Sequence, residues 1–432
     1  MDIIKKITKR NLVLNKKRSI FSVIGITLAV ALLVSVSTIA ASFKNSTIEF
    51  KKYLNGDYHF AYVPVTKEDV ESLKLNNKIE SLYTIGYQGS AVLEGVKGEN
   101  KPYATILTTD GTGVDKFPMQ LLEGRWPENE NEIVITEHLE RAGRLELQIG
   151  DELELEVGRR VDNEGNYLGV YDKYCGDNEK IIETGKRKYT VVGIMSRNGG
   201  VIEPSSSAGF AFLTYSQDPG DEIMVFTRYT KQGLADRRRV TAGILGVDEN
   251  ELDEYYEVNL PFKVFYNEEV VLSETIDLQN DNTGMMLTIV TAAFVIIIFT
   301  SVFCIKNSFE ISISEKKRQY GMLLGIGATK KQLRKSVFYE GFYLGMIGIP
   351  LGCVIGILFS FLLISVSDKM FLDYFEYDIS LKISIPAIII ACFLGIITVY
   401  LSALCGVKGA LKVSPVSAIR NEKEIIIDRK KV

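Results

Sequence analysis

The sequence predicts an α-helical membrane protein with four transmembrane helices and a large extracytoplasmic mixed α/β domain inserted between helices 1 and 2. The first observation behind this fold class is a set of long, mostly apolar runs without charged residues. A helix needs about 20 such residues to cross about 30 Å of hydrocarbon, and each run is longer than that. The runs are Ser19–Phe43, Asn282–Ile305, Gly341–Ser367 and Ile383–Val407.

The second observation is the segregation of charge along the 432-residue chain, whose net charge is only −4. Segments 1–18, 306–336 and 406–432 together carry +16, whereas residues 44–284 carry −17. Because basic residues accumulate on the cytoplasmic side of a membrane, we expect both termini and the 306–336 loop in the cytoplasm. The acidic domain and the 368–382 loop are then external, in a multi-pass protein of the cell (inner or cytoplasmic) membrane.

The first run is longer than the apolar core of a cleaved signal peptide, about 7–15 residues, so we expect it to remain as an anchor. Residues 1–18 mix apolar and basic side chains, which fits either an amphipathic helix on the inner leaflet or a plain basic flank. The expected segments in chain order are 1–18 (cytoplasmic amphipathic segment), 19–43 (transmembrane helix 1), 44–281 (external domain with stalk helices), 282–305 (helix 2), 306–336 (cytoplasmic loop), 337–367 (helix 3), 368–382 (external loop), 383–407 (helix 4) and 408–432 (cytoplasmic tail).

Inside the external domain, residue patterns predict both strands and helices. The segment DELELEV (151–157) alternates three glutamates with three apolar residues, which is typical of a half-buried strand. The other expected elements are strands at 131–137 and 187–195, a hairpin or mobile loop at 158–186, a loop at 196–208, an acidic helix at 249–257, and stalk helices at 44–55 and 268–281.

No motif in the chain points to catalysis, a metal or a bound cofactor. The Gly185-Lys186 pair lacks the glycine that a phosphate-binding loop needs five residues earlier, where Lys180 stands. The chain has 2 histidines, without the spacing of metal ligands, and Cys175 has no partner for a disulfide within the external domain. The apolar runs hold no Asp, Glu, Lys, Arg or His, which argues against a proton- or ion-coupled transporter and against a channel with a charged filter. Nucleic acid is not an expected partner.

The cytoplasmic loop is the first candidate functional segment. Residues 315–340 combine basic side chains, an apolar face and a Gly-Ala-Thr turn at Gly327–Thr329, followed by a basic helix that enters the third run. This pattern fits either a surface helix that receives force from a soluble partner or an ordinary basic loop.

A row of glycines in the third run is the second candidate. Small residues at three- and four-residue steps let two helices approach closely in lipid. The row forms either an interface that shifts during function or static packing, and Pro350 is expected to kink the helix. The glycines are Gly341, Gly345, Gly348, Gly352 and Gly356.

The loop resembles the signature of the FtsX-like ABC transporter permeases, in which this region is the coupling helix that docks on the ATPase. Gln319 departs from the family, which usually has an acid there, and this puts a salt bridge to the ATPase at that position in doubt. Residues 11–26 and 413–420 resemble the family's entry into its first span and its ending after the fourth. The resemblance implies an ATPase-coupling role for Arg318, Tyr320, Gly321, Leu324, Gly327, Ala328 and Thr329, and Glu340 and Gly341 also match.

The external domain is similar to the MacB periplasmic core domain at 121–135, 149–152 and 189–194. We expect structural roles for the matching residues, with glycines in turns and Arg125 paired with Glu132 in a buried ion pair. The matching positions are Gly124, Arg125, Asn131, Glu132, Gly150, Asp151, Val192 and Gly193.

Together these resemblances imply the permease subunit of a type VII ABC transporter. A separate ATPase subunit would bind ATP and magnesium, and its motion would be relayed to the external domain, a process called mechanotransmission. This chain would be no enzyme and would bind no cofactor itself. The implied partners are the ABC ATPase, a second permease chain in a homo- or heterodimer, membrane lipid and an extracytoplasmic adaptor protein.

The implied activity is export or expulsion of peptides, antibiotics or lipid-linked molecules. The acidic external domain fits either a preference for cationic peptides or the ordinary depletion of lysine and arginine outside the membrane. Two alternatives stay open. One is an FtsX-like regulator of cell-wall hydrolases, and the other is a ligand sensor that signals through a partner, for which the cytoplasmic tail is short. The chain is also compatible with being half of a longer, duplicated permease.

Overall fold

The computed structural model describes most of the chain, and its described residues divide into two compact units. One unit contains Met1–Ser46 and Asp277–Val432, and the other contains Thr47–Ile276. We call them the helical unit and the sheet unit. The described residues are 3–14, 16–97, 100–197, 200–250, 252, 263–275, 288, 291–293, 295–300, 303, 325, 327–371, 381–383 and 385–411.

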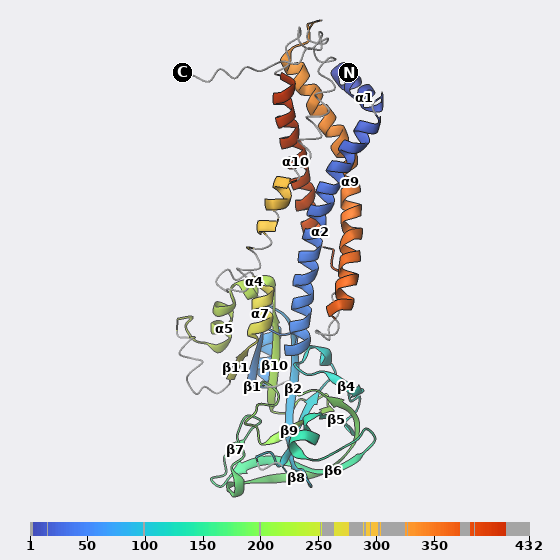
Figure 1. Cartoon of the computed structure of the whole chain (residues 1–432). Helices are drawn as coiled ribbons and strands as arrows, with labels where there is room; N and C mark the ends of the chain where they lie inside the picture. The colour runs from blue at the N-terminus through green and yellow to red at the C-terminus, as the bar shows by residue number, and fades with distance from the viewer. Residues whose placement is uncertain are drawn as a thin grey trace, which may run out of the picture. The chain divides into compact units, whose positions relative to one another are not determined.

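Long helices form the helical unit (Figure 1): α1 (Ile3–Leu14), α2 (Lys16–Asn55), α9 (Lys330–Phe371) and α10 (Ile385–Leu411). The stretches Ser19–Asn55 and Lys330–Val366 are long and apolar enough to cross a membrane, in agreement with the first and third expected spans. The other apolar helices are shorter, at Thr291–Thr300 and Ile388–Leu404, and much of 282–305 lies outside the described residues. The count of four spans therefore stays a prediction.

The helical unit has a small apolar core and a largely apolar surface. Phe342, Met346 and Phe393 are 62%, 67% and 62% exposed. An apolar surface of this kind is unfavourable in water, whereas lipid accepts it. The core is formed chiefly by Ile26, Val30, Leu33 and Val34 of α2, Leu333, Val337 and Leu344 of α9, and Ala391, Val399 and Ala403 of α10.

The sheet unit is built on one mixed 11-stranded sheet of order β11-β1-β10-β2-β3-β9-β5-β8-β6-β7, with β4 paired to β8. The β3–β9 and β5–β8 pairs are parallel, and the other described pairs are antiparallel. The strands are β1 (Phe60–Val65), β2 (Ile79–Val92), β3 (Tyr103–Thr109), β4 (Leu121–Gly124), β5 (Glu132–Thr136), β6 (Glu152–Asp162), β7 (Tyr167–Leu168), β8 (Glu179–Met195), β9 (Gly209–Tyr215), β10 (Glu222–Tyr229) and β11 (Lys263–Tyr266).

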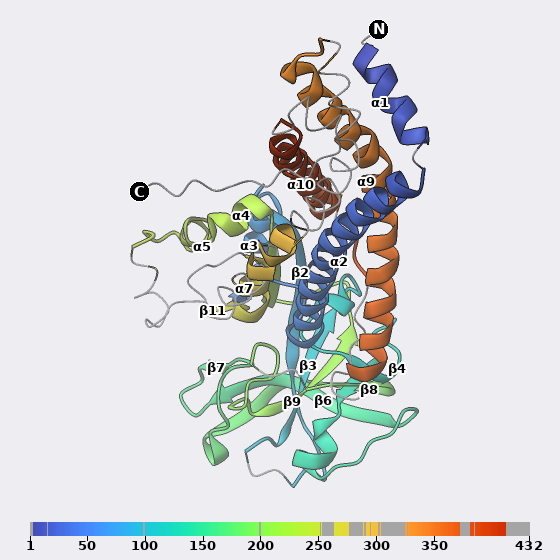
Figure 2. The ribbon, with the colours of Figure 1, turned by 45° about the horizontal axis from the view of Figure 1, so that its top comes forward.

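The α-helices that the structure describes between β1 and the end of the sheet unit gather at the β11–β1–β10 end of the sheet (Figure 2). They are α3 (Lys67–Lys74), α4 (Lys231–Ala235), α5 (Arg237–Leu245) and α7 (Glu268–Glu274). Val70 and Leu73 of α3 and Val271 of α7 pack with Phe60 of β1 and Tyr229 of β10 in one buried cluster. The predicted mixed α/β domain is therefore confirmed.

The three expected strands, at 131–137, 151–157 and 187–195, are present within or as β5, β6 and β8. In β6, Leu155 and Val157 are buried while the three glutamates of DELELEV are exposed. Strands β6 and β8 pair from Glu152↔Thr190 to Asp162↔Glu179, so the 158–186 stretch is a hairpin, one of its two predicted forms. The described part of 196–208 contains no helix and no extended strand, as expected of a loop.

The stalk predictions are met in part. Residues 44–55 are helical, because α2 continues to Asn55. The return stalk expected at 268–281 is shorter, since α7 ends at Glu274 and Thr275 has an extended backbone with φ −87° and ψ 143°. Residues 276–281, and most of the acidic helix expected at 249–257, lie outside the described residues.

Candidate functional site

The Gly-Ala-Thr turn starts helix α9. Gly327 has a φ of +98°, a left-handed conformation that favours glycine. Thr329 caps the helix, because the Gln332 N–H donates to its Oγ1 at 3.3 Å. The Thr329 N–H in turn donates to Oε1 of Gln332 at 2.8 Å. This reciprocal capping box fixes the point at which α9 begins.

The first turns of α9 are amphipathic. Leu333 and Val337 are 2% and 0% exposed and belong to the core of the helical unit. Thr8 of α1 lies on the same side, 3.0 Å from the hydroxyl of Ser336. The outer face is basic, and its exposed residues are Lys330, Lys331, Arg334 and Lys335. Cations near a helix N-terminus oppose the helix dipole, so this face does not serve the stability of the helix.

The other predicted coupling residues are not placed by the structure. Arg318, Tyr320, Gly321 and Leu324 lie outside the described residues. Ala328 is half-buried beside the capped turn.

The glycine row of α9 is buried along its whole length, from Gly341 to Gly356. A Cβ atom added to Gly348, Gly352 or Gly356 would lie only 2.7–2.8 Å from atoms of α2, whereas one added to Gly345 would lie 3.7 Å from Val399 of α10. The hydroxyl of Ser35 in α2 also donates to the Gly356 carbonyl at 2.9 Å. The row therefore brings α9 and α2 into close contact within the chain, and whether this contact shifts stays a prediction.

The glycines of the external motif shape turns and close contacts. Gly124 has a φ of +78°, and a Cβ there would lie 2.2 Å from the Val192 carbonyl oxygen. Gly150 has a φ of +102° and is followed by Asp151, whose carboxylate accepts the Gln148 N–H at 2.8 Å. These residues hold the backbone where β4 and β6 meet β8.

Arg125 and Glu132 form the expected ion pair, but the prediction that it is buried is wrong. Two parallel hydrogen bonds of 2.6 Å join them, while the Arg125 and Glu132 side chains are 47% and 15% exposed. The hydrogen bond from Arg125 lowers the pKa of Glu132 to about 2. The pair lies at the start of β5, beside the turn from β4, where water reaches the guanidinium.

A charged cluster that sequence reasoning missed joins the two ends of the sheet unit. Glu274 of α7 accepts from Arg228 of β10 at 2.6 Å and lies 3.1 Å from the Lys52 ammonium of α2. Arg228 also donates to Asp57, and the side chains of these four residues are only 15–20% exposed. We call Lys52, Asp57, His59, Arg228, Asn267 and Glu274 the stalk joint.

His59 gives the joint a fixed geometry. Its Nδ1 accepts the Tyr229 N–H at 2.9 Å, so the ring proton lies on Nε2, which donates to Glu274 at 3.1 Å. Burial acts to raise the pKa of Glu274, but the hydrogen bonds from His59 and Arg228, with Arg228 and Lys52 charges nearby, hold it well below its usual range.

Asn267 connects the segment that enters the sheet unit after α2 to the segment that leaves it through α7. Its side-chain amide donates to the carbonyls of Asn55, Gly56 and Tyr58 at 3.3, 3.1 and 3.0 Å. Its backbone N–H donates to the His59 carbonyl at 2.9 Å. The turn between α2 and β1 is thus fastened to the residue that precedes α7.

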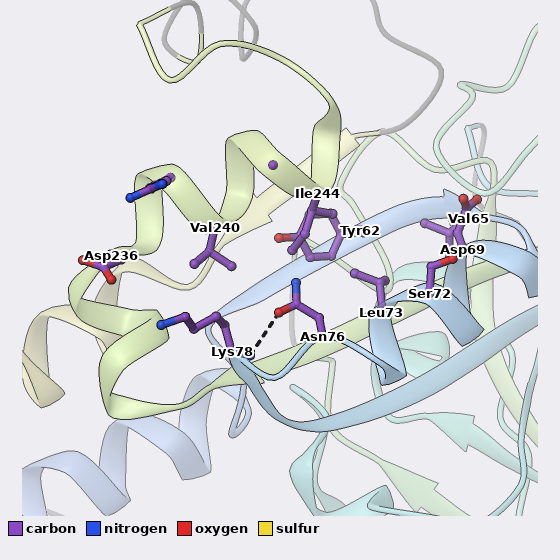
Figure 3. A pocket seen from close by; sticks show the side chains of 12 residues that line it. Tyr62, Val65, Asp69, Ser72, Leu73, Asn76, Lys78, Asp236, Val240 and Ile244 are labelled. Carbon is purple, nitrogen blue, oxygen red and sulfur yellow. Dashed lines mark hydrogen bonds between the residues drawn. The ribbon is translucent and has the colours of Figure 1, made fainter.

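A cavity of about 690 Å³ lies between α3 and α5 in the sheet unit. Figure 3 shows the side chains that line it, among them the apolar Leu73 and Val240 and the charged Lys78 and Asp236. Asp69 and Arg239 also line it, so its acidic and basic side chains balance.

Comparison with known proteins agrees with this architecture. The MacB-like periplasmic core domain model matches residues 19–250, more than half of the chain, and the FtsX-like permease C-terminal model matches residues 291–415. These two matches define a membrane permease of the ABC transporter type. The chain belongs to the MacB/FtsX-like family of ABC transporter permeases.

Relatives with this family's names support the assignment. An uncharacterized ABC transporter permease of Methanocaldococcus jannaschii is 21% identical over 434 aligned positions, 96% of each chain. The macrolide export ATP-binding/permease protein MacB of Mannheimia succiniciproducens is 24% identical over 251 residues, 56% of this chain and 35% of that one. An uncharacterized ABC transporter permease of Bacillus subtilis (strain 168) is 30% identical over 117 residues, 26% of this chain, and this match spans only 17% of that relative's length.

Proposed function

We propose that this chain relays ATP-driven motion of a separate ATPase subunit to its own sheet unit, for export or expulsion of peptides, antibiotics or lipid-linked molecules. The observation that carries the proposal is the unbroken α2 helix of 40 residues, which contributes to both units. At 1.5 Å per residue this helix is about 60 Å long, twice the ~30 Å of bilayer hydrocarbon. Such a helix transmits displacement along its axis because its backbone hydrogen bonds are internal.

The basic start of α9 is the point at which force enters. Lys330, Lys331, Arg334 and Lys335 present positive charge at a helix end where the dipole disfavours it. An acidic surface on a partner protein offsets that cost and steers the encounter. The capping box at Thr329 keeps the helix start in one conformation, so that a push on the turn moves α9 instead of unwinding it.

The glycine contact passes the motion from α9 to α2. Because the backbones approach too closely for a Cβ atom at Gly352, one helix cannot slide past the other without displacing Val30 and its neighbours. The stalk joint then passes the motion of α2 to β1, β10 and α7. Without the joint, the Gly56 turn after α2, at a φ of +85°, would absorb the displacement.

The remaining parts of the proposal follow from the family and the charge pattern. The ATPase subunit supplies ATP and magnesium chemistry, and this chain is its non-catalytic partner. A second permease chain, membrane lipid and an extracytoplasmic adaptor complete the assembly. The protein lies in the cell (inner) membrane with both termini in the cytoplasm, as the basic segments indicate.

The test is co-purification of an ATPase subunit with the full chain from native membranes. We expect at least tenfold less ATPase subunit to co-purify with the double variant Lys330→Glu/Lys331→Glu than with the wild type. The matched control is Lys97→Glu/Lys231→Glu, two exposed lysines of the sheet unit, which should retain wild-type amounts. Two results would overturn the proposal. One is purification of the wild-type chain without any ATPase subunit, and the other is co-purification of equal amounts of ATPase with the wild type and with Lys330→Glu/Lys331→Glu.

A further inference from the structure

A second cavity of the sheet unit, of about 270 Å³, combines aromatic rings with carboxylates. It lies between the start of β10, the edge strand β11 and the loop that follows β7. We call it the tyrosine–carboxylate pocket, and the lining residues that define it are Tyr87, Tyr167, Tyr171, Asp172, Glu222 and Lys263.

Two carboxylates converge on a gap left by a glycine. A Cβ atom built on Gly169 would lie 3.2 Å from Oε2 of Glu222 and 3.9 Å from Oδ2 of Asp172. Asp172 uses that oxygen to accept the Gly169 N–H at 2.7 Å. Glu222 is half-buried, and its carboxylate forms no ion pair with any residue that the structure describes. The nearby Arg159 pairs with Asp221 at 2.9 Å, and its charge also acts on Glu222. Two carboxylates therefore face the pocket, with Lys263 in its lining and Arg159 nearby as cations of the chain itself.

The aromatic walls already hold cations of the chain itself. The ammonium of Lys263 lies 5.2 Å from the centroid of the Tyr171 ring, and the guanidinium of Arg159 lies 5.3 Å from that of Tyr167. Aromatic faces attract cations electrostatically at such distances. The Lys263 side chain thus shows that an alkylammonium group is accommodated against this wall.

The pocket is built on rigid supports. Glu222 lies directly opposite Tyr87 in the β10–β2 register. Tyr171 donates its hydroxyl to the Val201 carbonyl and stacks on Phe265 with ring centroids 5.4 Å apart. The loop carrying Gly169 and Asp172 is held by Arg160, which donates to both of their carbonyls at 3.3 and 3.2 Å. The site is preformed, as small-ligand sites usually are.

We infer that the tyrosine–carboxylate pocket binds an alkylammonium group of the kind carried by lysine side chains of a cationic peptide. Glu222 and Asp172 face the ammonium, the tyrosine rings flank it, and Val63, Ile223 and Met224 contact the methylenes. The ammonium group of Lys263 competes with the ligand for the face of the Tyr171 ring. This inference deepens the proposed function by naming a substrate class, but the pocket is tested without any ATPase.

The experiment is isothermal titration calorimetry on the full chain in maltoside micelles, which contain no ammonium group. The probe is a lysine tripeptide with blocked ends, compared with the same peptide acetylated on every Nε. We expect the charged peptide to bind and the acetylated one to bind at least tenfold more weakly. Glu222→Gln should weaken binding about tenfold, equivalent to about 1.4 kcal/mol, whereas Lys263→Met should strengthen it.

Two further variants separate the pocket from general electrostatics and from misfolding. Gly169→Ala changes no charge but fills the gap between the carboxylates, so it should weaken binding as Glu222→Gln does. Glu156→Gln removes an exposed acid of β6 and should leave binding unchanged. The inference would be overturned if Glu156→Gln weakened binding as much as Glu222→Gln, or if the acetylated peptide bound as tightly as the charged one. Unchanged peptide affinity in both Glu222→Gln and Gly169→Ala would also overturn it. Binding of glycerophosphoethanolamine but not of the peptide would overturn the peptide assignment.

Discussion

The Nε2 atom of His59 lies 3.1 Å from the carboxylate of Glu274, joining a residue just before the first strand of the sheet unit to the last residue of α7. His59 is buried, and its other ring nitrogen is already occupied by the Tyr229 N–H. The contact therefore has one hydrogen-bonding arrangement, and Arg228 and Lys52 converge on the same carboxylate. The ends of the sheet unit are fastened to each other by this charged cluster.

Removal of the Glu274 charge should loosen the stalk joint. Glu274→Gln removes one of the two carboxylates that Arg228 and Lys52 share and leaves Asp57 as the other. We expect a loss of about 2 kcal/mol in the free energy of unfolding of the sheet unit. Trp126 is the single tryptophan of the chain and packs against the core of this unit, so its fluorescence reports unfolding. Glu269→Gln, which disrupts the exposed pair with Lys51, is the control and should cost below ~1 kcal/mol. Equal losses in the two variants would show that the joint is no stronger than a surface ion pair.

Two adjacent arginines should differ sharply in their contribution to stability. Arg160 and Glu179 are 3% and 0% exposed, and Arg160 also donates to three carbonyls of the loop at 169–173. Arg160→Met leaves a buried carboxylate unpaired and should cost about 3–5 kcal/mol. Arg159 pairs with the exposed Asp221, so Arg159→Met should cost below ~1 kcal/mol. Denaturant titration followed by Trp126 fluorescence measures both, and similar midpoints for the two variants would contradict the assignment.

The glycine row should tolerate a methyl group at one position and not at another. In Gly352→Ala the new Cβ would meet Val30 Cβ at 2.7 Å, and overpacking of this kind costs about 1–3 kcal/mol. Gly345→Ala meets Val399 at 3.7 Å, an ordinary contact, and should be neutral. In a Cys175→Ser background, the reaction of Cys353 and Cys392 with a thiol-reactive dye in detergent is followed on heating and gives the melting temperature of each variant. A lower melting temperature for Gly345→Ala than for Gly352→Ala would show that the helix contact is placed wrongly.

The start of α9 should depend on the Thr329 hydroxyl. Thr329→Ala removes the cap and should cost about 1 kcal/mol of local helix stability, whereas Thr329→Ser keeps it. Hydrogen exchange of amides in the first turn of α9 should accelerate about fivefold in the alanine variant only. Faster exchange in both variants, or in neither, would argue against the capping box.

The pH dependence of the sheet unit should include a contribution from Arg125 and Glu132. The folded pKa of Glu132 is held at about 2, below its ordinary value of 4.5, by the hydrogen bond from Arg125. A depressed carboxylate pKa stabilises the fold above the ordinary value, and this stability is lost as the pH falls from about 4.5 toward 2. Glu132→Gln should therefore be less stable at pH 6 and show a shallower decline below pH 4.5. If the stability of the wild type and of Glu132→Gln fell equally below pH 4.5, the ion pair would make no contribution to the pH dependence.

Local patterns in the sequence predict local structure well here. The alternation in DELELEV gives the buried and exposed faces of β6, and the glycine spacing in the third run identifies the face of α9 that meets α2. The Gly-Ala-Thr turn predicts the start of a helix because Gly327 and Thr329 have conformational preferences that act within a few residues.

The stalk joint and the tyrosine–carboxylate pocket could not be predicted in this way. Lys52 and Glu274 are far apart in the chain, and nothing in their neighbours indicates that they meet, since tertiary packing brings them together. Arg160 stands in a polar stretch that suits a loop, so its burial appears only when β6 and β8 pair. The exposure of Arg125 could not be predicted from the sequence either. A matching motif indicates that two residues pair, but it does not indicate whether water reaches them.

The central claim is that force enters at the capped start of α9 on one side of the membrane and reaches the sheet unit on the other. The most direct measurement is labelling of intact cells with a membrane-impermeant maleimide, using the exposed Cys175 of the sheet unit and an engineered Lys331→Cys in a Cys175→Ser background. The account predicts that Cys175 is labelled in intact cells and that position 331 is labelled only after permeabilisation. Labelling of both positions from the same side would contradict it.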